Sequence, residues 1–214
     1  MATTFWNKTE RKLLGKLNTP AKIQAFLDKV RYNISEKTHS PRFVMKLKTA
    51  HCFDGALFAA AALEFNGDPP ILVDLRSNHE DDDHVLAIFK RCGRYGAVAK
   101  SNYTGCRYRD PVFQTVRELV MSYFPIYFNL AGKKTLREFS VPFPLSKIKD
   151  VDWRKSPEDL TFLGDRIDRI RHFRLINKAS ERFLAMADER TFRGETLGLD
   201  PRGAFKAKGA RIRI

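Results

Sequence analysis

Cysteine is scarce in this chain, and long apolar runs are absent. The three cysteines, Cys52, Cys92 and Cys106, cannot all pair, and none belongs to a C-x-x-C motif, which excludes a disulfide scaffold. No stretch approaches the roughly 18 consecutive apolar residues of a membrane-spanning helix. The N-terminus is charged and lacks the apolar core of an export signal. We therefore expect a cytoplasmic protein with free thiols.

The common nucleotide-binding and hydrolase motifs are also missing. The sequence has no G-x-x-x-x-G-K-[ST], G-x-G-x-x-G, H-E-x-x-H or G-x-S-x-G. The run from Glu80 to His84 contains hard oxygens and an imidazole, but consecutive residues cannot all face one ion, and the spacing of a calcium loop is absent. We interpret that run as a solvated loop, and we expect no metal and no cofactor.

Acidic residues are outnumbered. The 214 residues include 39 Lys and Arg against 25 Asp and Glu, which gives a formal net charge of +14. Residues 51–90 are the exception, because they hold eight acidic and two basic side chains. A basic surface attracts nucleic acid, anionic lipid and acidic polypeptides alike, so charge alone identifies no partner. The apolar fraction of 43% is that of an ordinary folded domain.

The hydrophobic pattern predicts helices and strands in a mixed, α+β arrangement. Residues 52–65 form the clearest helix, with an alanine run and a stop at Asn66-Gly67. Residues 84–90 and 95–102 are apolar strands joined by a short hairpin turn. We divide the chain into a core, 1–150, and an extension, 151–214. The other expected elements are helices at 19–30, 111–123 and 156–189, strands at 71–75 and 136–141, and a flexible basic tail from Gly194.

Three polar residues stand where a thiol enzyme needs them. Cys52 opens a helix, and the positive end of a helix dipole stabilises a thiolate. His84 opens a strand and could accept the thiol proton. Asn102 ends the next strand and could orient the imidazole. The backbone N–H of Cys52 would face the oxyanion. Cys92 and Cys106 have no such context.

This order of residues resembles the transglutaminase-like superfamily, in a bacterial-type member. The similarity lies in a Cys that opens an Ala-rich helix, the bend Gly67-Asp68-Pro69-Pro70, a strand begun by His84 and a polar residue on the adjacent strand. It covers about residues 19–110. The resemblance implies a papain-related core in which the cysteine helix packs on a small antiparallel sheet, with added N- and C-terminal helices. It also implies Cys52 as nucleophile, His84 as general base and Asn102 as orienting residue.

The third member of the triad stays open between Asn102, Ser101 and Asp110. Relatives carry an Asp-Pro pair after an aromatic, and here that pair is Asp110-Pro111. Pairing Lys90 with Tyr95 across the hairpin places His84 opposite Ser101, because side chains alternate along a strand. A one-residue bulge would bring Asn102 to the His84 face.

An aromatic and basic loop follows this position. Arg107, Tyr108 and Arg109 could line a substrate groove and hold a carboxylate or phosphate. Equally, Arg109 could pair with other loops and fix the chain.

Two functions follow from these patterns. The first is a cysteine-dependent acyl transfer on an amide of a peptide or protein, with hydrolysis expected rather than cross-linking. The second is a catalytically inactive scaffold whose basic C-terminal region binds nucleic acid or an acidic partner. The basic side chains concerned are Arg166, Arg169, Arg171, Arg174, Arg202, Lys206, Lys208, Arg211 and Arg213. A solvated helix face with i,i+4 ion pairs explains the same charges, and no nucleic-acid motif accompanies them.

Overall fold

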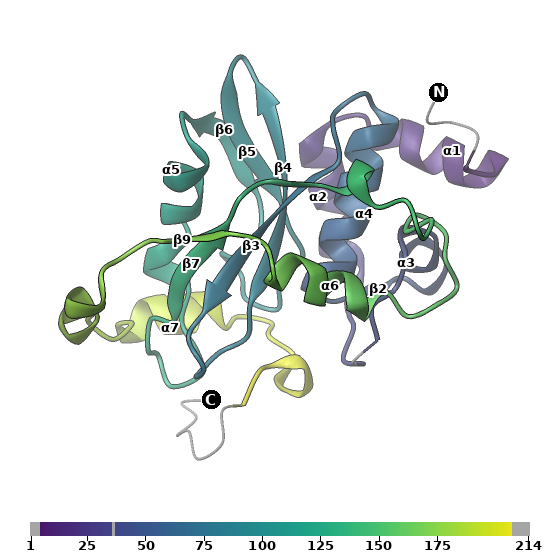
Figure 1. Cartoon of the computed structure of the whole chain (residues 1–214). Helices are drawn as coiled ribbons and strands as arrows, with labels where there is room; N and C mark the ends of the chain where they lie inside the picture. Colours follow the sequence, from purple (N-terminus) through teal and green to yellow (C-terminus); the bar gives the residue numbers. More distant parts are fainter. Residues whose placement is uncertain (1–4, 36, 207–214) are drawn as a thin grey trace.

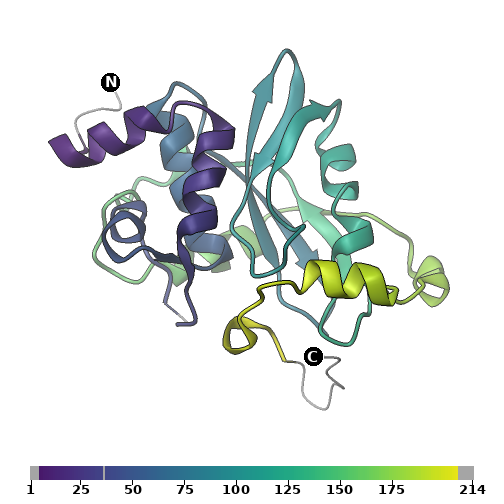
Figure 2. The same ribbon diagram turned by 180° about the vertical axis from the view of Figure 1, so that it is seen from behind.

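One antiparallel sheet with helices on both faces forms the molecule (Figure 1). The computed structural model describes residues 5–35 and 37–206. Helices α1 to α4 lie on one side of the sheet, with α2 and α4 directly against it, and α5 covers the other face (Figure 2). The mixed α+β class expected from the sequence is therefore confirmed. None of the helices in the described ranges is both long enough and apolar enough to cross a membrane.

The sheet has the strand order β6-β5-β4-β3-β7-β9, and β8 pairs with β3 beside this path. All of its pairs are antiparallel. A separate two-stranded parallel ribbon joins β1 to β2. The strands are β1 (Arg31–Tyr32), β2 (Thr49–Ala50), β3 (Ile71–Ser77), β4 (His84–Arg91), β5 (Arg94–Val98), β6 (Arg109–Phe113), β7 (Leu136–Ser140), β8 (Phe143–Pro144) and β9 (His172–Arg174).

Seven α-helices surround this sheet in the described ranges. They are α1 (Lys8–Lys16), α2 (Pro20–Lys29), α3 (Pro41–Leu47), α4 (Cys52–Phe65), α5 (Val116–Met121), α6 (Thr161–Asp168) and α7 (Glu189–Glu195). The short 3₁₀ helices are η1 (Phe124–Ile126), η2 (Leu145–Lys147), η3 (Lys178–Phe183) and η4 (Pro201–Gly203).

Helix α4 is the central helix of the larger core, and nearly all of its side chains are buried. Its four consecutive alanines let the backbone lie close to its neighbours α2, α3 and β4. His51 caps its start by accepting a hydrogen bond from the Phe53 N–H, and Asp54 accepts one from the His51 N–H. This capping box fixes the direction in which the chain enters the helix at Cys52.

Side-chain alternation divides the sheet into two cores. Val85, Ala87 and Phe89 of β4 face the α4 side, whereas Leu86 and Ile88 face the side covered by α5. By the same alternation His84 shares the face of Leu86 and Ile88. His84 therefore points away from the α4 face, and it shares with Cys52 only the lining of a cavity at the end of the sheet where β4 begins.

Most of the local elements expected from the sequence are confirmed. They include the helix at 19–30, with its Thr19 cap and Pro20 at the first position, and the helix at 52–65. The hairpin pairs Lys90 with Tyr95, as expected. The strands at 71–75, 84–90 and 136–141 are present as β3, β4 and β7. Strand β5 ends at Val98, however, four residues before the expected end.

Two expected helices are wrong. The helix predicted at 156–189 exists only as α6, and the chain then forms β9 and η3. The reason is a long-range partner, because β9 pairs with β7 and His172 bonds to the buried Asp74. The helix predicted at 111–123 begins only at Val116. Residues 109–113 instead form the edge strand β6, where proline is tolerated.

The C-terminal region does not form a free tail from Gly194 onward. Residues 195–206 fold back along the loop after β5, where the Thr104 N–H donates to the Glu195 carbonyl at 2.8 Å. The basic residues Lys208, Arg211 and Arg213 lie outside the described residues.

Candidate functional site

Cys52 is the first residue of α4, and its thiol lies beside the start of β4. The Sγ atom donates a long hydrogen bond of 3.9 Å to the carbonyl of Asp83, the residue directly before His84. The side chain is partly buried. Among the described residues, the backbone N–H of Cys52 has no hydrogen-bond acceptor, because the cap binds the amides of His51 and Phe53 instead. That N–H is the kind of donor that can stabilise an oxyanion.

His84 is buried, and one of its nitrogens is held by the backbone. Nε2 lies 2.8 Å from the carbonyl oxygen of Cys106. A carbonyl only accepts hydrogen bonds, so Nε2 carries the proton and Nδ1 of the neutral ring carries the lone pair. In the described part of the chain Nδ1 has no hydrogen-bond partner. Burial lowers the pKa of His84 to about 4, with a smaller contribution from Arg109, so the ring is neutral at pH 7.

Cys52 and His84 line one small cavity of about 60 Å³. No direct hydrogen bond joins their side chains in the described structure. The remaining lining residues come from β1, the loop before β4, the loop after β5, the segment after α5 and the C-terminal segment. Tyr127 closes one side, with its ring edge-on to His84 and its hydroxyl donating to the Asp82 carbonyl.

The electrostatics at Cys52 favour the protonated thiol. Burial raises the pKa of this thiol strongly, and the nearby carboxylates of Asp82, Asp54 and Asp74 raise it further. The helix dipole that favours a thiolate at this position is therefore outweighed. In its resting state the site holds a neutral thiol and a neutral imidazole rather than an ion pair.

None of the three residues expected to orient His84 does so. The side-chain amide of Asn102 is bonded to Asp200, and the Ser101 hydroxyl accepts from the Tyr103 N–H. Asp110 is exposed on β6, at the edge of the sheet. The orienting role that the sequence suggested for Asn102 is filled by the Cys106 carbonyl, because β5 ends early and the chain turns away before Asn102 reaches the His84 face.

The three expected substrate-binding residues lie in different surroundings. Arg107 forms an ion pair with Asp28 at 3.0 Å and lines a large pocket. Tyr108 stacks on Phe89 over the hairpin. Arg109 donates to Ser122 and to the carbonyls of Gly105 and Tyr108, and its guanidinium lies over the Tyr123 ring. Arg109 thus holds the loop against the end of α5, the structural alternative considered for it.

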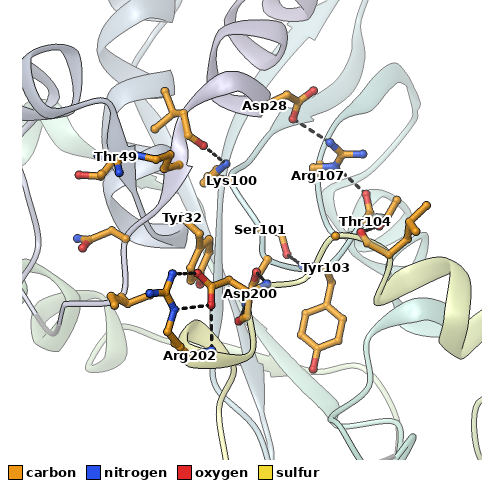
Figure 3. Close-up of a pocket in the computed structure, with 17 residues that line it drawn as sticks. Asp28, Tyr32, Thr49, Lys100, Ser101, Tyr103, Thr104, Arg107, Asp200 and Arg202 are labelled. Atoms are coloured by element: carbon orange, nitrogen blue, oxygen red, sulfur yellow. Dashed lines mark hydrogen bonds and ion pairs between the residues drawn. The ribbon is translucent and has the colours of Figure 1, made fainter. Parts of the chain in front are cut away.

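A wide pocket of about 730 Å³ opens beside the small cavity (Figure 3). The two share Tyr32, Ser101, Asn102 and Tyr103. Lys100 extends from the loop after β5, and its Nζ donates to the carbonyls of Leu27 and Val30 near the end of α2. Burial lowers the pKa of Lys100 to about 8. The ammonium group thus lies at the C-terminal end of α2, where a positive charge is favourable.

An acidic cleft of about 650 Å³ lies on the other side of Cys52. Asp74, Asp83 and Asp168 bring one carboxylate oxygen each within 4.8 Å of one another there. Two of these carboxylates already have partners, since Asp74 bonds to His172 and Asp83 accepts from Ser77. We assign no metal to this cluster, since nothing beyond the three carboxylates points to an ion.

Sequence reasoning missed three parts of the site. The Cys106 carbonyl has no signature in the sequence, because every residue carries that group. Tyr32, which lines all three cavities, belongs to a two-residue strand with no hydrophobic periodicity. Residues 203–205, which form another wall of the small cavity, fall within the basic tail that the sequence predicts.

No protein-family model matches this chain, and the search of curated proteins also returns no match.

Proposed function

We propose that this chain is a cysteine-dependent acyl-transfer enzyme of the transglutaminase-like type that acts on an amide. The observation that carries the proposal is the shared cavity of Cys52 and His84, in which the Cys106 carbonyl fixes the Nε2 proton and leaves Nδ1 as the base. A backbone carbonyl here does the work of the Asn or Asp side chain in related triads. The three free cysteines are consistent with the reducing cytoplasm that we propose as its location.

In the proposed reaction the Cys52 sulfur attacks the amide carbonyl carbon while its proton moves to Nδ1 of His84. The oxyanion that forms is stabilised by the Cys52 backbone N–H. The C–N bond then breaks, the amine leaves with the proton from His84, and a thioester remains on Cys52. Water attacks the thioester to give a carboxylic acid and the free thiol. Because the resting pair is neutral, the proton must leave the thiol as the S–C bond forms.

Acylation by a small activated ester tests this function. We expect p-nitrophenyl acetate to acetylate Cys52, and His84→Ala to slow that acetylation by about a hundredfold. The acetylated peptide is identified by mass spectrometry, and Cys92→Ser serves as the matched control, since Cys92 is exposed in the hairpin turn. Acetylation of Cys92 instead of Cys52, or an unchanged rate in His84→Ala, would contradict the proposal.

The second candidate is a catalytically inactive scaffold that acts as a binding module. The neutral thiol and imidazole favour it, because burial moves both pKa values away from an ion pair. Binding of nucleic acid receives less support, since Arg166, Arg174 and Arg202 pair with Asp150, Glu138 and Asp200. Failure of acylation together with salt-dependent binding of nucleic acid would favour this candidate.

A further inference from the structure

The C-terminal segment lies along the mouth of the candidate site. After α7, the Leu197 carbonyl accepts a hydrogen bond from the Thr104 hydroxyl, and a Glu195 carboxylate oxygen accepts one from the Gly105 N–H. The chain then passes Asn102, which bonds to Asp200 (labelled in Figure 3), and its residues 203–205 line the small cavity of Cys52. We call residues 200–205 the strap.

The Asn102 side chain binds only main-chain atoms of the strap. The side-chain Nδ2 donates to the Asp200 carbonyl and the Oδ1 accepts from the Asp200 N–H, both at 2.9 Å. Asp200 has extended backbone angles, φ −84° and ψ 110°. The pair of bonds is the one that a neighbouring strand would offer, so it is independent of the side chain of the bound residue. Any extended polypeptide could take this position.

The end of the strap forms a wall shared by the small cavity and the acidic cleft, both of which Cys52 lines. Gly203, Ala204 and Phe205 line both the 60 Å³ cavity and the 650 Å³ acidic cleft. Gly203 lies so close to the Tyr32 ring that a Cβ atom there would be 2.6 Å from it. A cavity of 60 Å³ has room for about two water molecules, and an amide substrate needs much more. The strap therefore fills part of the space beside the thiol and His84 in which an amide substrate would have to lie.

From these contacts we infer that the strap occupies, within its own chain, the path of an extended polypeptide substrate, and that Asn102 positions that substrate through its main chain. Naming Cys52 as the reacting group rests on the proposed function. Arg202 of the strap pairs with Asp200, whereas Lys206, directly after the strap, lines the cleft together with Asp82, Asp165 and Asp168. The acidic lining of this cleft favours a substrate with basic side chains beyond the residue held by Asn102.

The first experiment displaces the strap in the full chain. Gly203→Val places a side chain against the Tyr32 ring, and we expect it to raise the rate of Cys52 alkylation by iodoacetamide at least about tenfold. The matched control is Gly194→Val, because no atom lies within 4 Å of a Cβ there. Alkylation of the exposed Cys92 calibrates the reagent. Equal Cys52 rates in both variants would overturn the inference.

The second experiment supplies the polypeptide separately. A synthetic peptide with the sequence of residues 199–206, added to Gly203→Val, should restore protection of Cys52. The same peptide methylated on the nitrogen of its aspartate lacks the donor for Asn102 Oδ1 and should protect at least about tenfold more weakly. Asn102→Ala in the Gly203→Val background should abolish the difference between the two peptides. Equal protection by both peptides in Gly203→Val would overturn the role of Asn102.

These measurements need no turnover, so their failure is distinct from failure of the proposed function. Protection of Cys52 by the peptide without any acetylation of Cys52 would reject the enzyme and retain the polypeptide site. Acetylation of Cys52 without protection would reject the strap as a substrate mimic and retain the enzyme.

Discussion

Asp82 contributes a carboxylate to the wall of the cavity that holds the Cys52 thiol. Its negative charge disfavours a second negative charge on sulfur, so it raises the pKa of Cys52. The carboxylates around this thiol therefore oppose its ionisation, whereas the N-terminus of α4 favours it. The reactivity of Cys52 depends on whether the negative carboxylates or the positive end of the helix dipole has the larger effect on the sulfur.

Removal of this charge should make the thiol more reactive. We expect Asp82→Asn to lower the pKa of Cys52 and to raise its alkylation rate at pH 8 by about threefold. The rate is followed with iodoacetamide and peptide mass mapping. Asp110→Asn is the control, since Asp110 is an exposed carboxylate on β6 that lines none of the three cavities. A rate in Asp82→Asn no higher than in the control would show that the electrostatic argument is wrong.

The buried imidazole of His84 should make the protein less stable in acid. Its pKa is about 4 when folded and about 6.5 when unfolded, so the unfolded chain binds the proton more readily. The free energy of unfolding therefore falls as the pH drops from 6.5 to 4, by about 3 kcal/mol in total for this residue.

Substitution isolates that contribution. His84→Gln keeps an N–H donor for the Cys106 carbonyl but cannot titrate, so its free energy of unfolding should fall less steeply than the wild type between pH 6.5 and 4. Urea denaturation at a series of pH values measures the slopes. His79→Gln, at an exposed histidine of the same loop, is the matched control for the substitution itself. Parallel slopes for His84→Gln and the wild type would refute a buried neutral imidazole.

At the scale of elements, the position of α4 depends on one glycine. Gly55 lies one turn after Cys52, and a Cβ atom there would be 2.2 Å from the Cβ of Lys100. The missing side chain lets the loop after β5 cross α4 closely enough for Lys100 to reach the carbonyls of Leu27 and Val30. Packing here outweighs the low helix propensity of glycine.

Two alanine substitutions separate these effects. Gly55→Ala should destabilise the protein by about 2 kcal/mol, since the overpacking exceeds the gain in helix propensity. Gly164→Ala in α6, where the nearest atom to a Cβ is 3.7 Å away, should stabilise it by roughly 0.5 kcal/mol. Urea denaturation measures both. A stabilising Gly55→Ala would mean that the loop after β5 does not lie against α4.

Local signals predicted the elements that local forces determine. Helix α4 has a capping residue, an apolar body and a glycine stop, and the β4–β5 hairpin has a short turn, so both were predictable. The segment after Arg169 has a helical spacing of apolar residues, yet it forms β9 because β7 offers an edge and Asp74 a buried partner. Contacts between residues so far apart in the sequence cannot be predicted from the pattern of neighbouring residues.

The candidate site likewise has parts that the sequence predicts and parts that depend on long-range contacts. That Cys52 opens a helix and His84 opens a strand was predictable, because local signals determine both starts. The partner of His84 was not, because it is the backbone carbonyl of Cys106. Asn102 had the right chemistry for that role but lies past the end of β5, where alternation no longer determines its direction. Its contact with Asp200 joins positions 98 residues apart.

At the scale of the whole molecule, two buried histidines respond to pH in opposite directions. His172 ties β9 to the sheet through Asp74, at 2.9 Å, and both side chains are almost fully buried, at 3% and 2% exposure. Burial alone would lower the pKa of His172, but the bond to Asp74 raises it above its usual value. The stability from this pair is thus fully present below about pH 6.5 and is lost as the pH rises through the folded pKa. His84 acts against stability in the acid range where His172 supports it.

Breaking the pair should loosen the C-terminal half of the sheet. His172→Leu leaves the Asp74 carboxylate buried without its partner, next to Asp83 and Asp168, and should cost about 3 kcal/mol at pH 6 and less at pH 8. Replacing both partners, in Asp74→Leu with His172→Leu, should recover part of the loss, because no unpaired charge remains. Urea denaturation of the wild type, both single variants and the double variant gives the double-mutant cycle. Hydrogen exchange in His172→Leu should show faster opening of β7 and β9 than of β4 and β5. A double variant as unstable as the sum of its two singles would mean that the two side chains act independently, and the fastening of β9 would then have to come from its backbone pairing with β7 alone.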